Sequence, residues 1–472
     1  MTLGLLGAAL AAAACGGPPV EAGPEASTTA APAPAVDDAH PVRRLTGART
    51  RVVWVQDAGD GKDPFAQGTS LRLMGLDSDD GLGERPVLGE LGNYAKPMIT
   101  PRGDRVVFTN RREGVVYVVD GAGTNRRRLV EGFGLAVWRD PEGAEWVYVG
   151  TRYDDSEFPP YAPVHRLRID GPEVRELVWQ SPPVAEDNFQ LSADGRRASG
   201  AFPWPYCGVA DLASGTWQQR AEGCWASLAP DNSYILWVFD GAHRNVTLFD
   251  PNADRRHRVN VNGAPGMNGS EVYHPRWSNH PRFLAVTGPY TVGGLPNKIR
   301  GGGTGVDVHL GRFASDLSEV DAWSRVTDNA YGDFYPDVWI EPGASPVPPP
   351  VVPGIEPAPS VAASPARIVV DATLEQAGGM PTPESIAPYR AALLVNTYRV
   401  ERVIEGTYAQ ERVMAAHWVI RDGVVLDQAQ RREGETYRLT LEAYDDHPEL
   451  EGQRLVMDTD EFDLTLYYDA GS

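Results

Sequence analysis

The chain has 472 residues, of which 42% are hydrophobic and 9% aromatic, so it can bury the cores of two or three domains and is not a disordered polypeptide. Its net charge of −21 excludes nucleic acid and anionic membrane surfaces as bulk partners, because either needs a basic face.

The first fifteen residues, MTLGLLGAALAAAAC, are too few to span a bilayer but have the apolar core and small-residue end of a secretory signal. Their last part, from Leu10 to Cys15, resembles the lipobox of bacterial lipoproteins, whose cysteine is lipidated and becomes the mature N-terminus. The resemblance implies a signal peptide over residues 1–15 and a lipid anchor on Cys15. Because Gly16 is not Asp, it also implies the outer membrane, with the protein facing the periplasm or the cell surface. The chain departs from the pattern in lacking Lys or Arg before the apolar run, and the alternative is an Ala-rich stretch with an incidental cysteine.

Two segments are rich in proline and small residues and have almost nothing to bury. Residues 16–48 are expected to form a disordered tether, and residues 344–366 a linker that cannot donate regularly to a sheet. We expect this linker to isolate the C-terminal region, residues 367–472, from the segment before it.

Between these segments one turn phrase returns five times, each time before a short apolar strand. The copies are TPRGD, DPEGA, SADGR, APDNS and SNHPR, beginning at Thr100, Asp140, Ser192, Ala229 and Ser278. Their spacings of 40, 52, 37 and 49 residues fall in the range of propeller blades. Turn residues every 8 to 12 positions and the absence of helical periodicity predict an all-β module with four strands per unit.

A sixth unit exists only if the ends of the module meet. FYPDVWIEPG (334–343) matches the approach to a turn phrase but lacks the strand that follows, and ARTRVVWVQD (48–57) has the character of that missing strand. The sequence therefore predicts a split sixth blade, with its innermost strand from the end of the module and the rest from residues 49–92. Such a blade closes the ring and leaves no free sheet edge.

This module, residues 49–343, resembles the six-bladed TolB-like propellers built from PD40, or WD40-like, repeats. The resemblance rests on the TPRGD, SADG and APDN turns and on exits of the DGAGTNRRRL type. It implies an architecture that serves as an interaction platform, as a peptidase lid or as a sugar-active enzyme, and it does not select among them.

Few residues outside the repeat indicate chemistry. Cys207 and Cys224 are expected to form a disulfide in an oxidising compartment, the alternative being two small buried hydrophobic residues. A Gly-rich segment (289–305) carries Lys298 and Arg300, but it lacks the strand-to-helix context of a phosphate site and is interpreted as a flexible surface loop. No nucleophile elbow, Walker loop or zinc-protease motif is present, so no catalytic residue and no cofactor are assigned.

The repeat places a set of side chains at one mouth of the central channel. We expect the residues just before or within the innermost strands to converge there, namely Tyr94, Asn188, His274, Arg276, Tyr335 and Asp337. Aromatic and polar groups gathered at a mouth suit a sugar or an extended peptide, and the alternative is that they plug the channel. A metal site at His274, His280 and His309 is disfavoured, because its ligands would have to come from several blades.

Apolar and polar residues alternate along the expected strands of the C-terminal region, as in a small antiparallel barrel or sandwich. VNTYRVERVIEGTY and REGETYRLTLEAY resemble netrin-like, OB-type β-barrels, and the acidic segments 445–452 and 458–463 are interpreted as solvated loops. Taken together, these features favour an envelope lipoprotein that binds or scaffolds an envelope protein or glycan. The alternative is an enzyme or accessory factor acting on a cell-envelope or extracellular polysaccharide.

Overall fold

The structure, a computed structural model, describes residues 39–252, 255–267, 269–290, 302–343, 367–457 and 464–471. Residues 39–472 form one compact unit. Among the described residues its elements are strands, apart from three 3₁₀ turns and the short helix α1 (Pro41–Thr46). This helix buries Val42 and Leu45, so the described end of the segment expected to be a disordered tether, residues 16–48, is folded. Within the described residues no helix is both long and apolar enough to cross a membrane.

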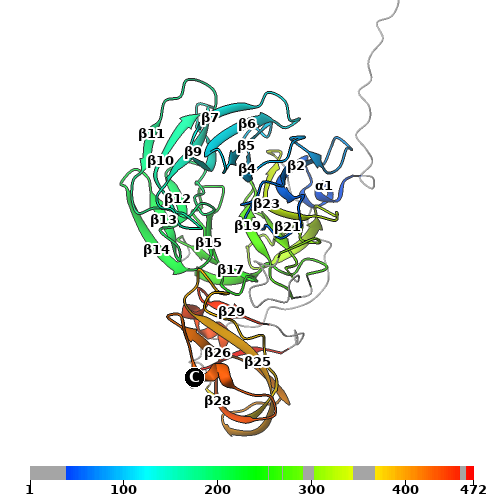
Figure 1. Cartoon of the computed structure of the whole chain (residues 1–472), viewed down its shortest axis with the longest axis vertical. Helices are drawn as coiled ribbons and strands as arrows, with labels where there is room; N and C mark the ends of the chain where they lie inside the picture. The colour runs from blue at the N-terminus through cyan, green and yellow to red at the C-terminus, as the bar shows by residue number, and fades with distance from the viewer. Residues whose placement is uncertain are drawn as a thin grey trace, which may run out of the picture. The chain divides into compact units, whose positions relative to one another are not determined.

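The first part of the unit is a six-bladed propeller, in which the sheets stand radially around a central axis (Figure 1). The first blade contains β4 (Tyr94–Ile99), β5 (Arg105–Asn110), β6 (Val115–Asp120) and β7 (Arg127–Glu131). The second contains β8 (Phe133–Arg139), β9 (Glu145–Arg152), β10 (Tyr161–Arg168) and β11 (Glu176–Trp179). The fourth contains β15 (Trp225–Leu228), β16 (Leu236–Phe239), β17 (Asn245–Asp250) and β18 (Arg255–Asn260). The fifth contains β19 (Tyr273–Trp277), β20 (Phe283–Gly288), β21 (Asp307–Phe313) and β22 (Val320–Arg325).

The third blade departs from the predicted four strands. It has three, β12 (Arg197–Ala201), β13 (Tyr206–Asp211) and β14 (Thr216–Glu222). Its innermost segment is joined to β12 by a single bridge between Leu191 and Ala198. The Asn188 side chain of this segment instead accepts a hydrogen bond from the Ala226 amide of the fourth blade at 2.5 Å.

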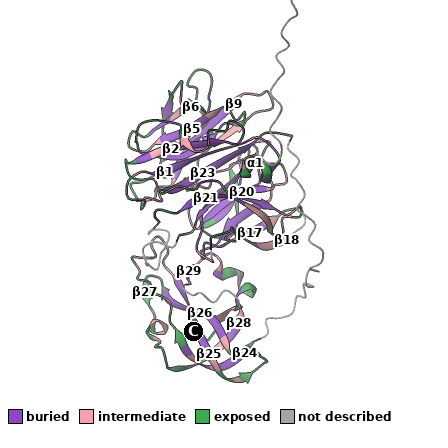
Figure 2. Cartoon of the chain, turned by 90° about the vertical axis from the view of Figure 1, so that its right-hand side faces the viewer, coloured by how far each residue is buried: buried purple, intermediate pink, exposed green. Residues whose placement is uncertain are grey.

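The sixth blade is split between the two ends of the module, as predicted. Its sheet has the order β23 (Gly332–Ile340), β1 (Thr50–Asp57), β2 (Leu71–Asp77), β3 (Arg85–Pro86). β1 pairs antiparallel with β23 along its whole length, from Thr50 opposite Ile340 to Asp57 opposite Gly332. Figure 2 shows both strands as buried.

The recurring turn phrase locks one blade to the next. In the first blade Thr100 and Gly103 close the turn, and the Gly103 backbone has a φ of 79°, which favours glycine. A Cβ at Gly103 would lie 2.4 Å from the Trp339 ring of the sixth blade, whose Nε1 donates to the Pro101 carbonyl at 3.0 Å. Trp138 of the second blade donates in the same way to the Ala193 carbonyl in the turn of the third blade, at 2.9 Å. In these two turns the phrase therefore receives a tryptophan from the preceding blade.

The second part of the unit is a closed β-barrel. Five strands close it in the order β24 (Ile368–Gln376), β25 (Ala392–Glu405), β26 (Arg412–Arg421), β30 (Leu466–Asp469), β28 (Thr436–Ala443), with β28 pairing back to β24. Two short strands, β27 (Val424–Val425) and β29 (Arg454–Val456), extend the sheet. The all-β fold class, the six-bladed propeller and the barrel are thus confirmed. The pairs β26/β30 and β25/β29 are parallel, which strand alternation cannot predict.

The barrel packs on the fourth blade of the propeller through the segment between β28 and β30, so the proline linker does not isolate it. Gly241 donates its amide to the Glu451 carbonyl at 2.7 Å and accepts from the Leu455 amide at 3.3 Å. The two backbones approach so closely that a Cβ at Gly241 would lie 1.9 Å from the Gln453 carbonyl oxygen. This contact therefore requires glycine at position 241.

A buried ion pair lies at the centre of this contact. Arg454 Nη2 donates to Glu271 Oε1 at 2.8 Å, and the two side chains are 0% and 2% exposed. Burial alone would raise the pKa of Glu271, but the Arg454 guanidinium and a hydrogen bond with His243 outweigh it and lower the pKa to about 2.

Acidic side chains of the barrel also pair with arginines of the fourth blade. Asp445 pairs with Arg258 at 2.6 Å, and Glu451 pairs with Arg256 at 2.9 Å. The described part of the acidic segment 445–452 is therefore used in docking and is not simply solvated.

We expect Arg454→Leu to lower the free energy of unfolding by roughly 3 to 5 kcal/mol, because it leaves the Glu271 carboxylate buried without its counter-charge. The double variant Glu271→Gln/Arg454→Leu should lose much less, since no buried charge remains. Arg256→Leu, which removes a partly exposed ion pair, is the control and should cost about 1 kcal/mol or less. Urea unfolding followed by tryptophan fluorescence measures all three.

The same ion pair predicts a dependence on pH. The pKa of Glu271 is lower in the folded protein than its ordinary 4.5, so its contribution is full above pH 4.5 and is lost as the pH falls toward 2. The double variant should lack this part of the acid sensitivity. Equal losses in the single and double variants would contradict the assignment of the ion pair as the centre of the contact.

Candidate functional site

Three innermost strands share a bulge that directs one side chain toward the channel. In each, the bulged residue precedes a proline and has a positive φ: Lys96 (44°), His274 (49°) and Tyr335 (52°). The pairing register shifts at each of these positions. Bulges of this kind redirect side chains next to functional sites.

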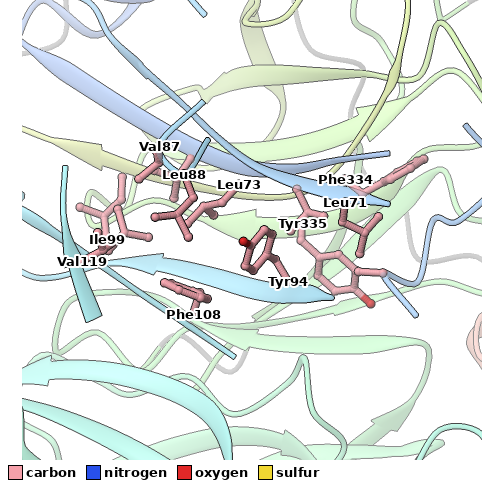
Figure 3. Close-up of a cluster of buried hydrophobic side chains, with 14 of the residues drawn as sticks. Leu71, Leu73, Val87, Leu88, Tyr94, Ile99, Phe108, Val119, Phe334 and Tyr335 are labelled. Atoms are coloured by element: carbon pink, nitrogen blue, oxygen red, sulfur yellow. The ribbon is translucent and has the colours of Figure 1, made fainter. Parts of the chain in front are cut away.

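This equivalence corrects the position of Tyr94. In the first blade the residue equivalent to His274 and Tyr335 is Lys96, two residues after Tyr94. Tyr94 itself lies between blades and is 2% exposed. Its ring packs at 5.4 Å from that of Phe108, and Figure 3 shows it among Leu73, Leu88 and Phe108. The sequence signal for the equivalence of Lys96, His274 and Tyr335 is that each of them directly precedes a proline.

A cavity of about 280 Å³ lies at one mouth of the channel. We call it the mouth pocket. Its walls are mainly aromatic side chains from both parts of the unit: Phe65, Phe158, Trp204, Trp225, Tyr273 and Tyr389. Two of the predicted residues, Asn188 and Tyr335, also line it.

The aromatic rings of the mouth pocket contact one another in two groups. Phe65 lies 5.1 Å from Phe158 and 6.0 Å from Tyr273, whose ring is 5.0 Å from Trp225. On the other side Trp204 and Tyr389 meet edge to face at 5.1 Å. The barrel thus supplies one wall of the pocket through Tyr389, which no pattern within the propeller sequence could indicate.

His274 lies behind the pocket wall and does not face the cavity. Its ring is 4.1 Å from that of Tyr335, and its Nδ1 is 3.0 Å from the Thr287 hydroxyl. Burial lowers the pKa of His274 well below its usual value and raises that of Tyr335 well above its own. Both side chains are therefore neutral near pH 7.

Arg276 and Asp337 line a second cavity of about 270 Å³, which we call the channel pocket. They form an ion pair at 3.0 Å, and Asp337 also accepts the Ile99 amide at 2.6 Å. Lys96 lines the same cavity, and its ammonium group donates to the Glu186 carbonyl. The two predicted residues, Arg276 and Asp337, thus hold the blades together around the channel and do not reach the mouth pocket.

Asp187 lines both cavities and was missed by the sequence analysis, although it directly precedes Asn188. Burial, followed by the charge of Glu186, raises the pKa of Asp187. Burial likewise lowers the pKa of Lys96 nearby. No hydrogen bond or ion pair joins the Asp187 carboxylate to another described residue.

The remaining predicted residues have other positions. Cys207 and Cys224 are buried and free, so the expected disulfide is not formed. The Cys224 thiol instead contacts the Tyr389 hydroxyl and lies 3.2 Å from His243 Nε2. Cys15, Lys298 and Arg300 lie outside the described residues, and the described part of the chain contains no group of three metal-ligating side chains.

We expect Tyr94→Ala to lower the free energy of unfolding by about 3 kcal/mol or more, because it removes a ring packed between blades. Tyr153→Ala removes a side chain of a residue that is 61% exposed, and its effect should stay within about 0.5 kcal/mol. Thermal and urea unfolding of the two variants compare these losses. An unchanged stability of the Tyr94 variant would return that residue to the list of candidate ligand contacts.

Comparisons with known proteins find similarity only at a low level. No protein family matches the chain, and no curated protein matches it. Among solved structures, a protein assigned as a TolB from Agrobacterium tumefaciens is 14% identical, with a TM-score of 0.32, over 60% of this chain and 91% of its own.

Two further structures are similar at the same level. Hydrazine synthase from Kuenenia stuttgartiensis is 14% identical, with a TM-score of 0.33, over 48% of this chain and 77% of its own. A gluconolactonase from Xanthomonas campestris is 14% identical, with a TM-score of 0.34, over 52% of this chain and 89% of its own. At this similarity the three structures carry no information about activity.

Proposed function

We propose that the protein is a binding module that holds a group of its ligand in the mouth pocket of the propeller. The observation that carries this proposal is the gathering of partly exposed aromatic rings around a cavity of about 280 Å³. Rings that served only to fill the channel would pack against one another and leave no such space. Concave sites with aromatic walls and a few polar groups are the usual form of ligand pockets.

The chemistry of the pocket favours binding over catalysis. Burial raises the pKa of the Cys224 thiol to about 12, so it remains a weak nucleophile at neutral pH. Burial also lowers the pKa of His243, which lies between Cys224 and Arg454 and is 3% exposed. Both residues line the mouth pocket, but the thiol contacts the Tyr389 hydroxyl and the imidazole contacts Arg454, so they also hold the barrel on the propeller.

We further propose that the module acts in the bacterial envelope, on an envelope protein or a glycan. The support is the sequence around Cys15, with its resemblance to a lipobox, and the proline-rich tether that follows it. Lipidation at Cys15 would anchor the chain in the outer membrane and leave the propeller free to reach its partner.

Trp204→Ala and Tyr389→Ala should each reduce ligand retention by about tenfold or more, because each removes one face of the mouth pocket. Glycan arrays and pull-downs from envelope extract, with the same purified ligand then titrated against each variant, measure the effect. Tyr153→Ala, which removes an exposed ring elsewhere, is the matched control and should bind like the wild type. Equal retention by the pocket variants and the control would overturn the proposed function.

Cys15→Ser should move the protein from the membrane fraction to the soluble fraction, because a serine hydroxyl cannot receive the thioether-linked lipid. Fractionation of cells expressing the full chain, with globomycin-treated cells as a control for signal processing, checks this. If wild type and variant fractionate alike, the lipid anchor is wrong, and the binding role of the mouth pocket is unaffected.

A further inference from the structure

The charges that face the mouth pocket are negative. Glu186 and Asp187 line it, and none of the described residues around it is Lys or Arg. This is a property of the lining alone, because Arg111 pairs with Glu186 and Arg276 lies close enough to act on Asp187. The pocket is therefore an apolar space bounded by acidic groups.

The nearby cations are engaged away from the cavity. Arg111 pairs with Glu186 at 2.6 Å, and its guanidinium lies over the Phe133 ring at 5.0 Å. Lys96 donates to the Glu186 carbonyl and lines the channel pocket. The Asp187 carboxylate has no hydrogen bond or ion pair among the described residues, although the charges of Lys96, Arg111 and Arg276 act on it from a greater distance. Because Asp187 also lines the mouth pocket, it is the acidic group placed to meet a ligand.

Some of the neutral hydrogen-bonding groups of the pocket are already used. The Asn188 side-chain oxygen accepts from the Ala226 amide at 2.5 Å. Cys224 and the Tyr389 hydroxyl contact each other, and His243 Nε2 lies 3.4 Å from that hydroxyl. The lining joins aromatic rings to an acidic group, and a cation needs both aromatic faces and a counter-ion.

We propose that the mouth pocket binds an alkylammonium group, that is, a methylated or protonated amine carried on a flexible chain, with Asp187 as its counter-ion. The ring faces of Trp204, Trp225 and Tyr273 provide the negative potential that attracts such cations. This inference rests on the proposed function, because it names the chemical class of ligand for the same pocket.

The test compares two probes of the same shape and different charge. Choline carries a trimethylammonium group, and 3,3-dimethylbutan-1-ol replaces its nitrogen with carbon. Isothermal titration should give an affinity for choline at least about tenfold higher, and Asp187→Asn should remove most of that difference. Asp155→Asn, which removes one exposed carboxylate elsewhere, should leave the difference unchanged.

A second variant covers the case in which Asp187→Asn does not fold. Trp204→Leu keeps an apolar side chain of similar reach and removes one aromatic face, so it should weaken choline more than the neutral alcohol. Equal affinities of the two probes for the wild type would overturn the alkylammonium assignment. The proposed function would still hold if the wild type bound another ligand and Trp204→Ala did not. Binding of neither probe would overturn the assignment as well.

Discussion

Closure of the ring by the pairing of β1 with β23 is the constraint on which the rest of the propeller depends. The two strands come from opposite ends of the module and pair antiparallel in one blade. An unpaired β23 would expose a sheet edge and the apolar faces of its neighbours. Trp339 of the sixth blade also donates a hydrogen bond to the Pro101 carbonyl of the first blade. Closure therefore fixes the position of every blade and hence of the channel.

The channel mouth owes its shape to the bulges that precede proline. Ordinary strand alternation would point Lys96, His274 and Tyr335 along the sheet faces, where they would pack between blades. At these bulges, which cost backbone strain, Lys96 lines the channel pocket and Tyr335 lines the mouth pocket. Tyr335 then forms part of the pocket wall, and His274 supports it from behind.

The barrel completes the site. Tyr389 packs edge to face against Trp204 in the wall of the mouth pocket and contacts Cys224 of the fourth blade. Its position depends on the Arg454–Glu271 ion pair and on the close backbone approach at Gly241. The pocket is thus a property of the two parts together, which gives the C-terminal barrel a direct role in the proposed ligand binding.

The sequence alone determined the features that depend on local contacts. The turn phrases predicted the blades because each turn is closed by hydrogen bonds within a few residues, as between Thr100 and Gly103. The split blade was predicted although its strands β1 and β23 lie at opposite ends of the module, because the other repeats define which strand the last repeat lacks. The approximate position of Asn188, His274 and Tyr335 near the axis followed from this periodicity, although the exact register at Tyr94 did not.

Only the tertiary structure decided how the site is composed. Tyr389 meets Cys224 across 165 residues, and Arg454 meets Glu271 across 183 residues, on segments that share no repeat or motif. The free state of Cys207 and Cys224 and the unpaired carboxylate of Asp187 likewise follow from how the blades and barrel pack. Such contacts are set by the folding of whole sheets against one another, and neither periodicity nor composition records them.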